Sequence, residues 1–169
     1  MLRRRHEYLY EDNLMKIIYH CFGGTHSSIV AAAIHLGWLP ADRLPAVTEI
    51  LAVPHFDRRP LGEEGKILFL GEDVWGNKVY AAGKRGMGPA YQNFLYSLVE
   101  ALGLPREELV LLDTSPLVNW PMIIGGFISR RLRVPLIGRP LVIWGVRRAF
   151  FRLASFVEEN RRLWEKSRP

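Results

Sequence analysis

Side chains that can bind an anion or act as nucleophiles gather around two glycines early in the chain. Residues 20–28 read HCFGGTHSS. An imidazole can act as a general base or bind an anion or a metal ion, and a thiol can act as a nucleophile. We therefore take His26 and Cys21 as candidate catalytic residues. The candidates for holding a ligand in the same segment are Gly23, Gly24, Thr25, Ser27 and Ser28.

A strand and a helix must position this segment. Apolar residues predict a short buried strand over 16–20 and a helix over 29–36 that stops at Gly37. A tight glycine loop that leads into a helix leaves backbone N–H groups unpaired at the helix start, and these groups favour an anion. Three hydroxyl residues are candidates for the cap of this helix: Thr25, Ser27 and Ser28.

The segment departs from the Walker A loop, G-x-x-x-x-G-K-[ST], at most of its defining positions. When the final hydroxyl is aligned, His26 takes the place of the lysine, and His20 and Thr25 take the places of the glycines. A histidine reaches less far than a lysine and is mostly neutral at pH 7. The segment therefore predicts a degenerate P-loop, and magnesium-dependent nucleotide hydrolysis by the usual route is not expected.

The same segment begins like the cysteine-phosphatase loop, H-C-x5-R-[ST]. His20 and Cys21 match its start, but Ser27 stands where an arginine should clamp the phosphoryl group. A helix N-terminus can activate a thiol, so Cys21 is a candidate nucleophile; the alternative is a small buried residue at a strand end. Three arginines from elsewhere in the chain could replace the missing clamp: Arg139, Arg147 and Arg148.

A second glycine loop follows a predicted β-hairpin. Strands are predicted over 66–71 and 78–82, with turn-forming residues between them. The loop over 83–88 reads GKRGMG and leads into a predicted helix. Lys84 and Arg85 in this loop could grip a phosphate or a carboxylate.

An apolar run over 109–113 ends in an acid and predicts a central parallel strand. Ligand sites in open α/β sheets lie at the carboxyl ends of strands. We therefore expect Asp113 to face the first loop and to orient a metal ion or a hydroxyl group. No resident metal site is predicted, because no cysteine and histidine cluster has zinc spacing. His55 and Asp57 are expected on a loop surface, and His35 on a partly exposed helix face.

Together these elements predict one α/β domain. We expect a three-layer, mostly parallel sheet with helices on both faces and an edge β-hairpin, similar to P-loop and Rossmann-like folds. A helix is predicted over 119–131 and a last strand over 141–144, before a final amphipathic helix. We place the domain over 15–169. Residues 1–14, which are charged and lack a clear period, are interpreted as a flexible extension or an over-long gene prediction.

Composition limits the environment and the partners. The chain has 169 residues, one cysteine and a net charge of +6. A single cysteine allows no internal disulfide, which favours a reducing cytoplasm, and no apolar run is long enough to predict a transmembrane segment. Arginines crowd the last forty residues, at positions 130, 131, 133, 139, 147, 148, 152, 161 and 162.

Several segments resemble the domain-of-unknown-function family 3189 of Firmicutes. The likeness is carried by YHCFGGTHSS, AAAIHLG, GNKVY, DT, GGFISRRL, GRP and GVRR, in that order along the chain. It covers about residues 15–160 and implies a small bacterial cytoplasmic protein. Because this is a family of unknown function, the resemblance implies no activity and no ligand.

Two hypotheses for function stay open, one for an enzyme or ligand-binding protein and one for an interaction module. In the first, a P-loop-like site binds a phosphate-bearing small molecule or a nucleotide, and phosphoryl transfer or hydrolysis proceeds through His26 or Cys21 with Asp113. The ligand-binding residues would be Gly23, Gly24, Thr25, Ser27, Ser28, Lys84, Arg85, Arg147 and Arg148. In the second, the basic C-terminal third contacts a protein, nucleic acid or membrane surface, although no nucleic-acid-binding signature accompanies the arginines.

Overall fold

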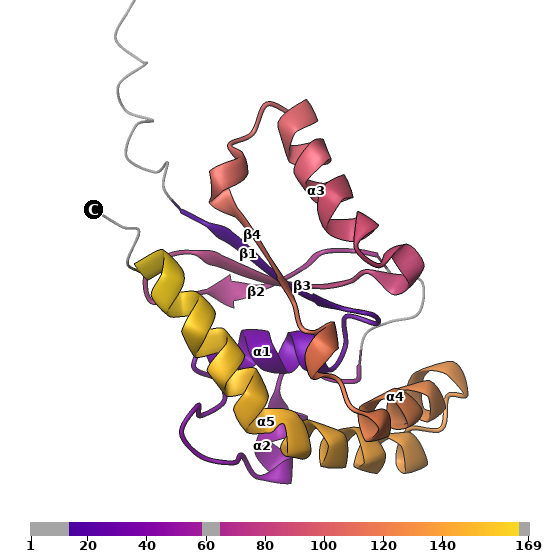
Figure 1. Ribbon diagram of the computed structural model, residues 1–169. Helices are drawn as coiled ribbons and strands as arrows, with labels where there is room; N and C mark the ends of the chain where they lie inside the picture. The colour runs from indigo at the N-terminus through magenta and orange to yellow at the C-terminus, as the bar shows by residue number, and fades with distance from the viewer. Residues whose placement is uncertain (1–13, 59–64, 166–169) are drawn as a thin grey trace, which may run out of the picture.

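The structure, a computed structural model, describes residues 14–58 and 65–165 (Figure 1). Within these ranges the chain forms a mixed four-stranded β-sheet with helices packed on both of its faces. No helix among these residues is both long enough and apolar enough to cross a membrane. The extension predicted over 1–14 lies, apart from Leu14, outside the described residues.

The strands run in the order β2-β3-β1-β4. β1 (Lys16–Cys21) pairs in parallel with β3 (Lys78–Gly83) and with β4 (Leu109–Asp113). β2 (Leu68–Glu72) pairs antiparallel with β3, so the predicted hairpin does stand at an edge. The prediction of a central position for β4 is wrong, since β4 forms the opposite edge. Its apolar run reflects the burial of its two faces and does not require a strand on each side.

Helices cover both faces because successive side chains of β1 point in opposite directions. Tyr19 packs in a core with α1 (Ser27–His35) and α5 (Pro135–Glu165), whereas Ile18 packs in a second core with α3 (Ala90–Ala101). Figure 1 shows α3 on one side of the sheet and α1 and α5 on the other. The connections that follow β1 and β3 therefore leave the sheet toward opposite faces.

The predicted strand over 141–144 is wrong, because this segment lies inside the long helix α5. A short apolar run is compatible with a strand or with a buried helix, and only its continuation reveals the period. In α5 the buried residues recur at helical spacing: Val142, Val146, Ala149, Phe150, Leu153 and Val157.

A helical hairpin lies below the sheet in Figure 1, formed by α4 and the first part of α5. The helix predicted over 119–131 is in fact α4 (Trp120–Gly126) followed by a turn of π-helix, η4 (Phe127–Arg131). A glycine lets the two helices approach, because a Cβ on Gly125 would lie 2.6 Å from the backbone nitrogen of Val142. The remaining short elements are α2 (Val47–Ala52), η1 (Arg85–Met87), η2 (Arg106–Glu108) and η3 (Ser115–Leu117).

Candidate functional site

The two glycine loops meet at the carboxyl ends of β1 and β3. Gly24 has a φ of 70°, and a Cβ there would lie 2.5 Å from the backbone nitrogen of Gly83. A Cβ on Gly83 would in turn lie 2.8 Å from the carbonyl oxygen of Gly23. Both distances are too short for any side chain, so the loops depend on glycine to lie in backbone contact.

The serines of the first loop bind neighbouring strands instead of capping α1. Ser28 Oγ lies 3.4 Å from Cys21 Sγ, and Ser27 Oγ lies 3.0 Å from Oγ1 of Thr114, which follows β4. The N-cap residue of α1 is His26, whose side chain makes no capping hydrogen bond. The predicted hydroxyl cap is therefore wrong. The two hydroxyl groups are completely buried and are satisfied by these partners.

The side chain of His26 pairs with Asp57, which follows α2. His26 Nε2 lies 3.0 Å from Asp57 Oδ1, with the carboxylate fully buried and the imidazole 13% exposed. The backbone N–H of Asp57 donates to the carbonyl oxygen of Thr25 at 3.2 Å, which holds the segment after α2 against the loop. The predicted surface position is thus wrong for Asp57, while His55 is exposed as predicted.

Two further donors converge on the Asp57 carboxylate. Ser129 Oγ, in η4, donates to Oδ2 at 2.6 Å, and Arg139 Nε, in α5, donates to the same oxygen at 3.0 Å. Burial alone would raise the pKa of Asp57, but the hydrogen bonds from His26, Ser129 and Arg139 outweigh it and lower the pKa to about 2. At neutral pH Asp57 is a buried carboxylate held by three side chains from three parts of the chain.

This carboxylate determines which ring nitrogen of His26 is available. Because Asp57 is ionised it can only accept, so His26 Nε2 carries the proton of the Asp57 hydrogen bond. In the neutral imidazole Nδ1 then carries a lone pair, and no hydrogen bond within the described ranges engages it. The ring packs against Gly126 of α4, where a Cβ would lie 3.0 Å from Cε1 and 3.3 Å from Nδ1. A buried acid therefore orients a partly exposed base.

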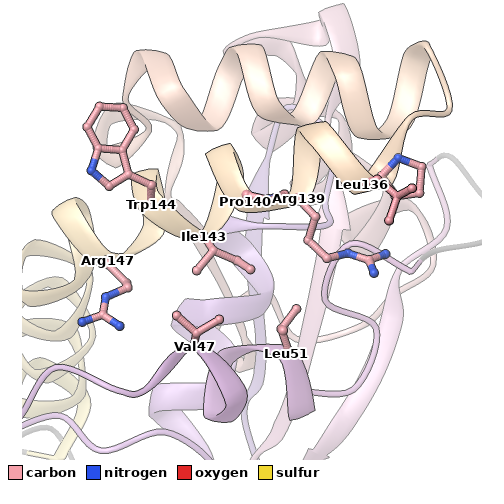
Figure 2. Close-up of a pocket in the computed structure, with 9 residues that line it drawn as sticks. Val47, Leu51, Leu136, Arg139, Pro140, Ile143, Trp144 and Arg147 are labelled. Atoms are coloured by element: carbon pink, nitrogen blue, oxygen red, sulfur yellow. The ribbon is translucent and has the colours of Figure 1, made fainter.

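Arg139 links this cluster to a groove between α2 and α5. The groove has a volume of about 560 Å³ and is mostly apolar. Figure 2 shows Arg139 near one end of it and Arg147 near the other, with Val47 and Leu51 of α2 facing Ile143 of α5. The side chain of Arg139, which binds Asp57 through Nε, is 30% exposed and lines this groove.

A second charged cluster lies on the α3 side of the sheet. Lys84 Nζ donates to Asp113 Oδ2, and the backbone N–H of Ser115 donates to Oδ1 at 2.9 Å. His20 Nδ1 is 3.6 Å from the same carboxylate, and Nε2 lies 3.1 Å from the side-chain nitrogen of Gln92. Burial lowers the pKa of His20 to about 4 despite the nearby carboxylate. Lys84 and Asp113 therefore pair with each other, on the opposite face from His26.

The other predicted basic residues take separate positions. Arg85 lies 6.0 Å from the ring centre of Phe22, at the exposed tip of the first loop. Arg147 lines the groove, and Arg148 stacks 5.3 Å from the ring centre of Trp144. Of the three arginines considered as a replacement clamp, Arg139 is the one bonded to the acid that holds His26. Cys21 is buried, and its Sγ accepts the backbone N–H of Gly24 at 3.1 Å.

Ser129 and Gln92 were not predicted from the sequence to lie near these histidines, and Asp57 was predicted on the surface. Ser129 and Asp57 are 72 residues apart, and neither belongs to a motif with His26. The one available signal was the resemblance, which includes the glycine and serine of the segment GGFISRRL. Across residues 14–58 and 65–165, no three histidine, cysteine, aspartate or glutamate side chains are grouped so as to hold a metal ion.

Comparison with known proteins gives one match. A family model, described as a protein of unknown function (DUF3189), matches residues 16–162. No curated protein and no solved structure matches the chain. The match includes the glycine loop, Asp57, Ser129 and Arg139, so the whole cluster around His26 lies inside the family region.

Proposed function

We propose that this chain, which belongs to the DUF3189 family of proteins of unknown function, binds a phosphate-bearing small molecule or nucleotide at the N-terminal end of α1. The observation that carries the proposal is the His26–Asp57–Arg139 cluster: a base and a guanidinium group fixed by one buried carboxylate beside a glycine loop. On this view the fold is a three-layer relative of P-loop and Rossmann-like folds, with a degenerate phosphate loop.

Three sources of positive potential support an anionic ligand. The backbone N–H groups at the start of α1, which has nine residues, carry the partial positive charge of the helix. Arg139 donates to Asp57 through Nε, and its two terminal nitrogens remain available to donate to an oxyanion. His26 adds a third donor when it is protonated. This set takes over the task that the lysine of a Walker A loop or the arginine of a phosphatase loop performs.

The same geometry supports phosphoryl transfer or hydrolysis. With Nε2 fixed by Asp57, His26 Nδ1 can take the proton of an attacking hydroxyl group or water as its oxygen bonds to phosphorus. The bond to the leaving oxygen then breaks, and that oxygen departs with its electron pair. Asp57 stabilises the imidazolium that forms. The alternative nucleophile in this proposal is Cys21, with Asp113 and Lys84 on the other face of the sheet available to a larger ligand.

Binding can be tested by isothermal titration and thermal shift with inorganic phosphate, AMP and ATP. Arg139→Gln should weaken the binding of the best of these probes by roughly tenfold, since a charge-assisted contact is lost. Arg152→Gln is the matched control, because Arg152 is an exposed arginine of the same helix that bonds only a carbonyl oxygen at 3.4 Å. Equal binding by both variants, or no binding of any probe, would contradict the proposal.

Catalysis needs a separate measurement. If the site hydrolyses phosphate esters, p-nitrophenyl phosphate should be cleaved, and His26→Ala should lower kcat by about 10²-fold or more while phosphate binding falls less. Cys21→Ser distinguishes the two nucleophile assignments, because a thiol mechanism would lose its activity with this change. Phosphate binding without turnover would leave the site as a binding site and remove the enzymatic half of the proposal.

A further inference from the structure

An exposed apolar stripe runs along the outer face of α4. Trp120, Ile123, Ile124 and Phe127 recur at helical spacing, and all four are exposed. In a globular domain such a stripe normally faces the core. Here the opposite face of α4, which carries Met122 and Gly125, packs against α5.

The apolar surface continues beyond α4 in two directions. At one end the ring of Trp120 meets that of Trp144 in α5, with a centroid distance of 5.5 Å. At the other end the connection to α5 exposes Leu132 and Val134, and the first turn of α5 exposes Leu136 and Ile137. Leu136 is 89% exposed, although leucine usually lies inside a domain. Many large apolar side chains exposed on one hairpin are typical of an interaction site.

The charges on the same hairpin have one sign. Between Thr114 and Val157 the chain has seven arginines and no lysine, aspartate or glutamate. Arg131, Arg133 and Arg148 are exposed on or beside the apolar surface. Two copies of this face would bring like charges together with no acid to offset them, which disfavours a symmetric dimer. The partner must therefore offer apolar surface and negative charge at once.

We propose that the α4–α5 hairpin docks on the surface of an anionic lipid membrane. Isoleucine, leucine and phenylalanine side chains would enter the boundary between headgroups and acyl chains, and arginines would bind the lipid phosphates. Tryptophan favours this boundary, because its ring is apolar and its N–H is polar. Nucleic acid also attracts arginine and stacks on aromatic rings such as those of Trp120 and Phe127. Most exposed apolar side chains of this hairpin are aliphatic, however, and give it neither hydrogen bonds nor stacking surfaces.

Vesicle co-sedimentation of the full chain tests the docking. The protein should bind phosphatidylcholine vesicles that contain phosphatidylglycerol, bind pure phosphatidylcholine vesicles weakly, and dissociate as salt is raised. Phe127→Glu should weaken binding by roughly tenfold or more. The matched control is Phe94→Glu, because Phe94 on α3 is 53% exposed and Phe127 is 54% exposed. Arg131→Gln should weaken binding about fivefold, and Arg106→Gln, an exposed arginine of η2, should not.

Several outcomes would overturn the proposal. These are absence of binding to anionic vesicles, equal binding to neutral vesicles, and equal binding by Phe127→Glu and Phe94→Glu. A dimer in solution that Phe127→Glu dissociates would assign the face to a second copy. Salt-sensitive binding to RNA that is unaffected by Phe127→Glu, without vesicle binding, would assign the arginines to nucleic acid. Both substituted side chains are exposed, so unchanged melting temperatures should accompany each result.

Discussion

Helix α1 carries a histidine–aspartate pair at each of its ends, and the two pairs differ at the second ring nitrogen of the histidine. At the C-terminal end, His35 Nε2 lies 3.1 Å from Asp73 Oδ2 and Nδ1 lies 2.8 Å from the hydroxyl group of Tyr19. At the N-terminal end, His26 Nε2 lies 3.0 Å from Asp57 Oδ1, and the ring packs against Gly126. The second ring nitrogen is hydrogen-bonded to a tyrosine in one pair. In the other pair the ring packs against a glycine, and no hydrogen bond within the described ranges engages that nitrogen.

This difference separates a structural pair from one that can carry out chemistry. His35 and Asp73 have side chains 0% and 1% exposed, and burial lowers the pKa of His35 although Asp73 opposes the shift. With both nitrogens engaged, His35 can neither accept a proton nor reach a ligand without breaking the core. His26 also pairs with an aspartate, but it retains a basic nitrogen and some exposure. The residue types are the same at both ends, and the two pairs differ in access to the second nitrogen.

The largest expected effect is a loss of stability on changing His35 at the C-terminal end of α1. His35→Ala should lower the free energy of unfolding by about 3 kcal/mol, because it opens a cavity in the core and leaves the Tyr19 hydroxyl group without this partner. The Asp73 carboxylate loses one hydrogen bond and keeps those from Trp75 and Asn77. His26→Ala should lower the free energy of unfolding by about 1 kcal/mol, since Asp57 keeps Ser129 and Arg139. Urea denaturation measures both. Equal losses would show that the two pairs have the same structural role.

A smaller effect is expected from another buried histidine, His20 on β1. The folded-state pKa of about 4 lies below the usual unfolded value near 6.5, so the unfolded chain takes up the proton first as the pH falls. Stability should therefore fall by about 2 kcal/mol between pH 7 and pH 4.5 from this residue alone. His20→Gln should remove that part of the pH dependence. Denaturation at the two pH values checks this, and an unchanged slope would contradict the burial of His20 as its cause.

Much of the fold follows from local patterns. Short apolar runs bounded by glycine and proline predicted all four strands of the sheet, together with α1 and α3, within a few residues. The strand predicted over 141–144 was wrong because four apolar residues do not distinguish the strand period from the helical one. Edge and central positions of strands depend on pairing, which a single run such as that of β4 does not encode.

The surroundings of His26 could be predicted only in part, for the same physical reason. The glycine loop and His26 form one local segment, whereas the residues that define the chemistry of His26 come from distant ones. Asp57, Ser129 and Arg139 meet only once α2, η4 and α5 have packed, and hydrogen bonding across such distances leaves no spacing in the sequence. The expected role of His35 was wrong for the same reason, since its partners Tyr19 and Asp73 lie on other elements.

We expect the smallest effect on stability from Gly126→Ala. This change acts on the N-terminal end of α1, where the His26 ring lies. In α4 an alanine favours the helix by up to about 1 kcal/mol, but its Cβ would press on the His26 ring at 3.0 Å. These effects should nearly cancel in the free energy of unfolding.

Because the His26 ring is displaced, the Gly126→Ala variant should nevertheless bind phosphate several-fold more weakly in isothermal titration. Gly86→Ala in the second glycine loop is the control, because a Cβ there meets no atom within 4 Å. If Gly126→Ala binds phosphate as tightly as Gly86→Ala does, the space beside His26 has no part in ligand binding. The contrast between a tyrosine at one end of α1 and a glycine at the other would then be one of packing alone.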